Sequence, residues 1–127
     1  MPALLLASLI SLSAQAVTLP RAVAYLPQTQ ALCGGAAAAM VMRYWGDTTI
    51  RPEDFAPLVD TSREGIVTTT LVGDLRARGW QAFPLRGGDD FPSISDHLSR
   101  GRPVIALIED RPSRYHYVVI IAIDGEV

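Results

Sequence analysis

The segment at residues 34–45 constrains the fold more than any other part of the sequence, because it is apolar on nearly every face of a helix. Four consecutive alanines are followed by Met40, Val41 and Met42. Alanine has the highest helix propensity, and a helix that is hydrophobic all round is buried inside a protein. Gly46 follows and is expected to end the helix. The sequence therefore predicts a central buried helix around which the other elements pack.

Two β-branched runs near the end of the chain give the second strong signal. Residues 103–109 and 115–123 are almost continuously apolar, as expected for strands of a sheet that is buried on both faces, and a loop containing Pro112 joins them. Asp124-Gly125 then predicts a tight turn. Because only two residues follow this turn, we expect the domain to continue beyond residue 127.

Shorter elements are expected in the rest of the chain. They are an extended segment at 17–26, helices at 52–59, 69–78 and 93–100, a polar loop at 61–65, a short strand at 80–85 and a turn at 87–90. Thr68 precedes the second of these helices and is expected to cap it. With helices first and antiparallel strands last, the predicted fold class is α+β.

Length and composition limit the classes of function. A chain of 127 residues suffices for one domain. It is 49% hydrophobic and 19% charged, with a formal net charge of −2, which excludes a disordered or a nucleic-acid-binding protein. One cysteine and two histidines allow no intrachain disulfide and no convincing zinc site, so we expect neither a metal nor a cofactor.

The first sixteen residues are interpreted as a secretory signal peptide, which leaves residues 17–127 as the mature domain. Residues 3–12 are apolar and uncharged, and Ala14-Gln15-Ala16 supplies the small-x-small pattern of a cleavage site. The apolar run is too short to cross a bilayer, which needs roughly 20 residues. We therefore expect export to the periplasm or the medium, with no membrane span in the mature chain. The alternative is a buried first helix of the domain.

Cys33 is the candidate nucleophile. It directly precedes the predicted buried helix, where unpaired backbone N–H groups and the helix dipole stabilise a thiolate, the nucleophilic form of cysteine. Gly34 and Gly35 are expected to keep side chains away from the sulfur, so that a substrate carbonyl can approach it. The alternative is a cysteine that serves as a small buried hydrophobic residue.

Two further side chains are candidates for the same chemistry. Gln28 could supply an amide that stabilises the oxyanion of acyl transfer; Gln30 is the competing candidate, and a glutamine that merely bonds to a turn is the alternative. His116 begins an apolar strand, where its nitrogens need partners. It is the candidate general base for Cys33, and a satisfied core histidine is the alternative. His97 lies among polar residues and is interpreted as a solvated surface residue.

These motifs taken together resemble a known family. Leu26-Pro27-Gln28 and Leu32-Cys33-Gly34-Gly35, with the alanine-rich segment after them, are similar to the active-site helix of the double-glycine peptidases. This is the bacteriocin-processing branch of the papain-like cysteine peptidases. Gly101-Arg102-Pro103-Val104, followed by His116-Tyr117-Val118-Val119, resembles the histidine strand of that family. The resemblance extends from Tyr25 to the end of the chain.

The resemblance implies a papain-like α+β fold and thiol-dependent cleavage of peptides, often after a Gly-Gly pair. Cys33 matches the nucleophile, His116 the general base and Gln28 the oxyanion-hole side chain. Gly35 stands where many members have proline. The family's third residue, an Asp or Asn on the strand after the histidine strand, has no counterpart here. Asp124 is no substitute, because eight residues of strand place it on the order of 20 Å or more from His116.

Three functions stay open on this basis. The first is a cysteine peptidase that acts on peptides or proteins outside the cytoplasm, and the second is an acyl transferase that uses the same acyl-enzyme. The third is a non-catalytic peptide-binding module. The missing orienting residue favours the module, whereas the presence of Gln28, Cys33 and His116 favours catalysis.

Overall fold

The computed structural model of the chain describes residues 16–85 and 91–124. The predicted signal peptide therefore lies outside the described residues except for Ala16. The same holds for the predicted turn at 87–90 and for Gly125 of the predicted tight turn.

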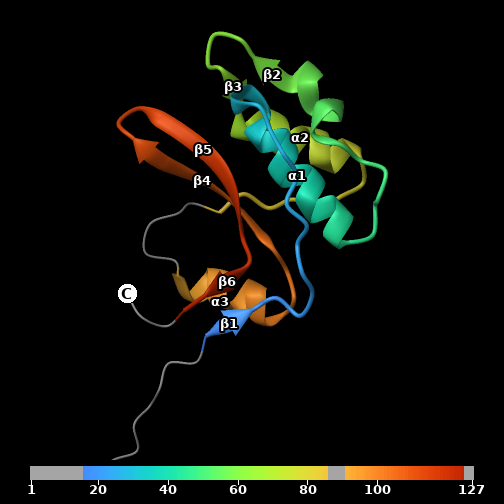
Figure 1. Ribbon diagram of the computed structural model, residues 1–127, viewed down its shortest axis with the longest axis vertical. Coiled ribbons are helices and arrows are strands. Elements are labelled where there is room, and N and C mark those ends of the chain that lie inside the picture. Colours follow the sequence, from blue (N-terminus) through green and yellow to red (C-terminus); the bar gives the residue numbers. More distant parts are fainter. Residues whose placement is uncertain (1–15, 86–90, 125–127) are drawn as a thin grey trace, which may run out of the picture.

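The described chain contains helices, short strands and one long two-stranded ribbon (Figure 1). In chain order the elements are β1 (Val17–Thr18), η1 (Gln30–Leu32), α1 (Cys33–Tyr44), η2 (Pro52–Leu58), β2 (Val59–Asp60), β3 (Gly65–Ile66), α2 (Thr68–Ala77), α3 (Phe91–Ser99), β4 (Val104–Arg111), β5 (Arg114–Ile120) and β6 (Ala122–Ile123), where η marks a 3-10 helix. The strand pairs β1–β6, β2–β3 and β4–β5 are all antiparallel. The predicted class, α+β with an N-terminal helix and C-terminal antiparallel strands, is confirmed.

Helix α1 is the centre of the molecule, as its all-round apolar sequence predicts. Ten of its twelve residues are buried. The backbone then turns at Gly46, whose φ of +107° lies in the left-handed region that favours glycine. The predicted central helix is confirmed. It is buried because no face of it is polar enough to be left in water.

The main hydrophobic core surrounds α1 on the side of η2, α2 and β3. Phe55 of η2 is fully buried there, with Leu71 of α2 and Ile66 of β3 in the same cluster. The predicted helix at 52–59 is present as a 3-10 helix, and Pro57 inside it explains why. In an α-helix the proline ring would clash with the carbonyl oxygen four residues earlier.

A second, smaller core lies at the other end of α1. Tyr44, Leu19 and Leu98 form it, with α3 and the β1–β6 pair around them (Figure 1). The Tyr44 hydroxyl donates to the carbonyl of Gly101 at 2.8 Å, which ties the end of α1 to the turn before β4. The first and last strands of the described chain therefore share one core with the end of the central helix.

Strands β4 and β5 form a ribbon that packs against α1 through β5 (Figure 1). Their register pairs Ile108 with His116 and Leu107 with Tyr117, and it shifts by a bulge between Glu109 and Arg111. The expected burial on both faces is wrong, since Leu107 and Ile108 are 46% and 43% exposed. The described sheet has two strands, so α1 covers only part of one face.

Two smaller expectations are also corrected, and a third is confirmed. Residues 80–85 form no strand, because Pro84 removes a backbone donor and the Arg76 guanidinium binds the carbonyl of Ala82 instead. The polar loop predicted at 61–65 is confirmed for residues 61–64, which form the turn of a small hairpin, β2–β3, whose second strand begins at Gly65. Thr68 does not cap α2, since Val67 holds the cap position and Thr68 is the first helical residue.

Among the described residues, none of the helices has the length and apolar character needed to cross a membrane.

Candidate active site

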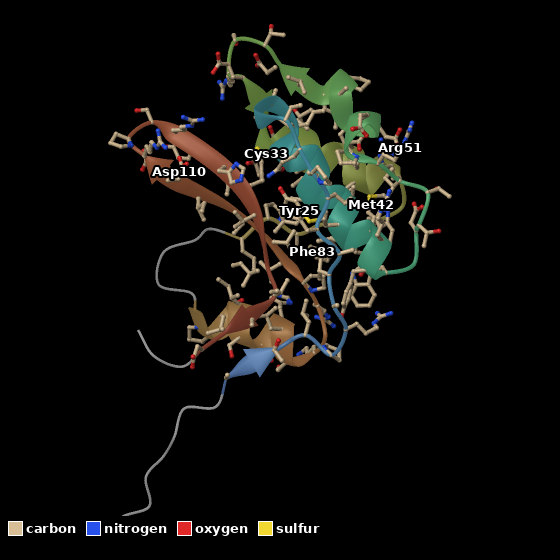
Figure 2. All side chains as sticks on the ribbon, viewed as in Figure 1. Tyr25, Cys33, Met42, Arg51, Phe83 and Asp110 are labelled. Atoms are coloured by element: carbon tan, nitrogen blue, oxygen red, sulfur yellow. The ribbon has the colours of Figure 1, made fainter. Side chains whose placement is uncertain are left out.

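Cys33 is the first residue of α1 and follows η1 without a break. Its side chain is buried, with 5% of its surface exposed. The first N–H groups of a helix have no partner inside it, and the helix dipole places partial positive charge at this end. Figure 2 shows Cys33 at the end of α1 that lies beside the ribbon. Cys33 therefore lies at the start of the buried helix, close to where the sequence predicted it.

The two glycines after Cys33 serve a different purpose from the one expected. A Cβ on Gly34 would lie 3.1 Å from the ring of Tyr117, and one on Gly35 would lie 2.8 Å from both the Cβ of Phe55 and the carbonyl of Pro52. Both positions therefore face packed protein. The expectation that they keep space open around the sulfur is wrong: they let β5 and η2 approach the start of α1 closely.

His116 is the third residue of β5 and is half-buried. Its Nε2 lies 3.4 Å from the Nε2 of Gln28, although 88 residues separate the two in sequence. The other end of the Gln28 amide, Oε1, is buried without a hydrogen-bond partner among the described residues. The fold thus brings two of the three predicted site residues together.

Tyr117 joins the histidine strand to the cysteine helix, a connection that was not predicted from the sequence. Its ring packs on Gly34, and its hydroxyl donates to the carbonyl of Ile66 at 2.9 Å. The hydroxyl also lies 2.9 Å from Oγ1 of Thr68, which is then the donor. Burial raises the pKa of Tyr117, and the neighbouring Cys33 raises it further. The available signal was a tyrosine inside an apolar strand, since a buried phenol needs a hydrogen-bond partner.

A hollow of about 340 Å³ lies in front of the Gln28–His116 pair. Its lining comes from the segment before η1 and from the turn end of the ribbon: Tyr25, Gln28, Thr29, Asp110, Arg114, Tyr115 and His116. Tyr25 and Tyr115 are 73% and 60% exposed, so both rings are accessible to a ligand. Figure 2 labels one residue from each of these segments, Tyr25 beside α1 and Asp110 at the turn end of the ribbon.

The remaining candidates lie elsewhere. Gln30 begins η1, and His97 lies half-buried in the last turn of α3 rather than fully solvated. Asp124 follows β6 and is exposed. The described residues contain no group of three or more histidine, cysteine or acidic side chains that could hold a metal ion.

Comparison with known families gives one match. Residues 20–127 match the Peptidase_C39 like family, a span that covers both site segments. Comparisons with curated proteins and with solved structures found no match. The matched span includes Gln28, which precedes α1, Cys33, which begins α1, and His116 on β5. The chain therefore belongs to the Peptidase_C39 like family, which is related to the double-glycine, bacteriocin-processing peptidases of the papain-like group.

Proposed function

We propose that the protein is a cysteine peptidase that cleaves peptide bonds through an acyl-enzyme on Cys33. Family membership supports the reaction class. The observation that carries the residue assignment is the 3.4 Å contact between Gln28 and His116, since it joins segments 88 residues apart beside the helix that begins with Cys33.

The proposed reaction begins with transfer of the Cys33 proton to His116. The thiolate then attacks the peptide carbonyl carbon, and the carbonyl oxygen becomes an oxyanion. The Cys33 backbone N–H and the Gln28 amide N–H donate to this oxyanion. The imidazolium of His116 returns its proton to the leaving amine as the C–N bond breaks, which leaves a thioester.

Water completes the reaction. His116 takes a proton from the water molecule as its oxygen attacks the thioester carbonyl. The C–S bond breaks, the acid is released and the Cys33 thiolate is restored. An acceptor amine in place of water would make the same acyl-enzyme a transferase. Cleavage after a Gly-Gly pair is the substrate preference that we propose from the family relationship.

A non-catalytic peptide-binding module is the second candidate. The low exposure of Cys33, at 5%, favours it, because a substrate carbonyl must reach the sulfur. We further propose that residues 1–16 are a signal peptide and that the protein acts in the periplasm or the medium.

The test is the rate of alkylation of Cys33 by iodoacetamide as a function of pH, in the full chain and in His116→Ala. A catalytic pair keeps alkylation fast well below pH 8.5, about the ordinary pKa of a thiol, and His116→Ala removes this advantage. Cys33→Ser and His116→Ala are each expected to abolish peptide hydrolysis while the circular-dichroism spectrum stays native. Ordinary thiol behaviour that is indifferent to His116 would overturn the peptidase and leave the binding module.

A further inference from the structure

A second hollow, also of about 340 Å³, lies between η1 and the β2–β3 hairpin. Its lining consists of Ala31 of η1, Val59 of β2, and Thr61 and Glu64 of the hairpin turn. Figure 1 shows the hairpin beside η1, at the end of the molecule where α1 begins. This hairpin hollow has no lining residue in common with the hollow in front of the Gln28–His116 pair, so it is a separate feature.

The hairpin hollow is close to Cys33, because Ala31 forms one of its walls. Ala31 and Cys33 are two positions apart in the chain, so their Cα atoms are at most about 7 Å apart. Val59, on another wall, packs against the core cluster that contains Cys33. An extended peptide advances about 3.3 Å per residue. A peptide whose cleaved bond lies at Cys33 can therefore place a side chain in this hollow from within about three residues of that bond.

The lining of the hairpin hollow is apolar where it is half-buried and polar where it is exposed. Ala31 and Val59 are half-buried, whereas Thr61 and Glu64 are exposed. A lysine or arginine side chain has the same division, since its aliphatic stem lies along apolar surface while its charged head stays near water. The Glu64 carboxylate supplies the opposite charge at the exposed edge. The lining therefore matches a basic side chain in both polarity and charge.

The turn that carries Glu64 is built by a different acid, Asp60. The Asp60 carboxylate accepts hydrogen bonds from the hydroxyl of Ser62 at 2.6 Å and from its N–H at 2.9 Å, and the N–H of Arg63 donates to it at 3.3 Å. The bonds from Ser62 hold the pKa of Asp60 below its ordinary value, and the charge of Arg63 lowers it further. The negative charge of Asp60 is thus used within the turn.

Glu64, by contrast, occupies its position in the turn at a cost to the backbone. Its φ is +52°, in the left-handed region that residues other than glycine, asparagine and aspartate seldom adopt. Backbone strain of this kind is found more often at functional sites than elsewhere. None of the ion pairs in residues 16–85 and 91–124 involves the Glu64 carboxylate. The turn is therefore strained at the residue that brings negative charge to the hollow.

We propose that the hairpin hollow is a substrate subsite that binds a lysine or arginine side chain lying within about three residues of the cleaved bond. The aliphatic stem of the substrate side chain packs on Ala31 and Val59, and its charged head forms an ion pair with Glu64. The Thr61 hydroxyl accepts a further hydrogen bond from that head. This inference rests on the proposed function and adds a preference for basic residues to it.

The first test measures hydrolysis of peptides that contain a central Gly-Gly pair with alanine elsewhere. One lysine is placed in turn at each of three positions before the pair and three after it, and norleucine at the same position is the uncharged match. At one position, lysine is expected to raise kcat/KM about fivefold over norleucine, as for an ion pair at a partly exposed site. Glu64→Gln is expected to remove this gain, whereas Glu53→Gln, at an exposed glutamate outside the hollow, keeps it. Cleavage without such a position, or a gain that survives Glu64→Gln, overturns the subsite.

The second test requires no turnover and so separates the subsite from the proposed function. The same peptides are titrated into Cys33→Ser chain, and binding is followed by calorimetry. The lysine peptide is expected to bind about fivefold more tightly than its norleucine match, and the difference is expected to shrink at high salt. Adding Glu64→Lys to this chain should reverse the preference, so that glutamate at the same position binds best.

The two tests together give a distinct result for each failure. If the Glu64-dependent preference appears in binding but the wild-type chain cleaves none of the peptides, the subsite stands and the peptidase fails. If the peptides are cleaved with no such preference, the peptidase stands and the subsite fails. Peptides that are neither bound nor cleaved overturn both.

The strain at Glu64 gives a control for stability. Glu64→Gly places at this φ the residue that adopts it most readily, so the urea midpoint is expected to stay the same or to rise, while the preference for lysine is lost. A lower midpoint would mean that the Glu64 side chain stabilises the turn, and it would overturn the functional interpretation of the strain.

Discussion

Helix α1 and the β4–β5 ribbon carry the two halves of the candidate site, and they are held in very different ways. Ten of the twelve residues of α1 are buried, whereas Tyr117 is the one buried residue of the ribbon. Packing on nearly every side therefore fixes Cys33. His116 is fixed by a strand with one buried anchor and by the polar contact to Gln28. In this molecule the candidate nucleophile is positioned by the core, and the candidate base is positioned by a few identifiable hydrogen bonds.

The largest difference is expected for truncations of apolar side chains. Phe55→Ala removes a fully buried ring beneath α1 and should lower the free energy of unfolding by about 3–5 kcal/mol. Leu107→Ala on the half-exposed ribbon should cost about 0.5 kcal/mol. Urea denaturation followed by circular dichroism measures both. Equal losses would show that the ribbon belongs to the same packed core as α1.

The second prediction concerns the close approach of η2 to α1. Gly35→Ala places a methyl group 2.8 Å from the Cβ of Phe55 and the carbonyl of Pro52, so the two elements must separate. The expected destabilisation is about 1–3 kcal/mol. Gly73→Ala in α2 is the matched control, because nothing lies within 4 Å of its new Cβ. It should stabilise the protein by about 0.5–1 kcal/mol. A harmless Gly35→Ala would refute the packing role assigned to this glycine.

The third prediction concerns Tyr117, the buried residue that anchors the ribbon. Tyr117→Phe removes the hydroxyl that binds Ile66 and Thr68, and it should cost about 1–2 kcal/mol. Because β5 carries His116, the variant should also react more slowly with iodoacetamide at pH 6 than the wild type. Tyr115→Phe, at an exposed position of the same strand, should change neither quantity. If Tyr117→Phe loses stability but keeps full reactivity, the anchor does not position the base.

The smallest expected effect is a change in how the stability of the protein depends on pH in the alkaline range. The folded state raises the pKa of Tyr117 above the usual value of about 10, so the folded chain holds this proton more tightly than the unfolded chain does. The resulting stability is constant below pH 10 and is lost as the pH rises through the folded pKa. Urea midpoints between pH 9 and 11 should fall less steeply in Tyr117→Phe than in the wild type. If the urea midpoints of the two proteins fall equally steeply with pH, groups other than Tyr117 cause the loss of stability at alkaline pH.

The sequence predicted the parts of the molecule that depend on local pattern. Helix α1 follows from its all-round apolar composition, and the positions of Cys33 at its start and His116 on a strand follow from the surrounding elements. Their roles in catalysis stay predictions. The contact between Gln28 and His116 had no local signal, because it joins segments 88 residues apart.

The failures of prediction have a common physical cause. The interpretation of Gly34 and Gly35 depends on their neighbours along the chain, but their roles depend on Tyr117 and Phe55 across the fold. Threonine is a residue type that often caps helices, yet the hydroxyl of Thr68 forms a hydrogen bond with Tyr117 instead. The burial of β4 was overestimated, because a run of apolar residues does not reveal how many layers cover it. In each case the deciding partner is distant in sequence.

The pairing of β1 with β6 has a mechanical consequence. Val17 faces Ile123 and Thr18 faces Ala122, and the N–H of Leu19 donates to the carbonyl of Ile121 at 3.0 Å. Residues 17 and 123 lie at the same end of this antiparallel pair. A force that pulls them apart therefore acts in the unzipping direction and breaks the hydrogen bonds one after another. Such a ladder yields at low force and releases the segment that leads to Gln28, while α1 bears little of the load. Tension between residues 17 and 123 would therefore open the small core around Tyr44 before it reaches the main core, against which Leu26 packs.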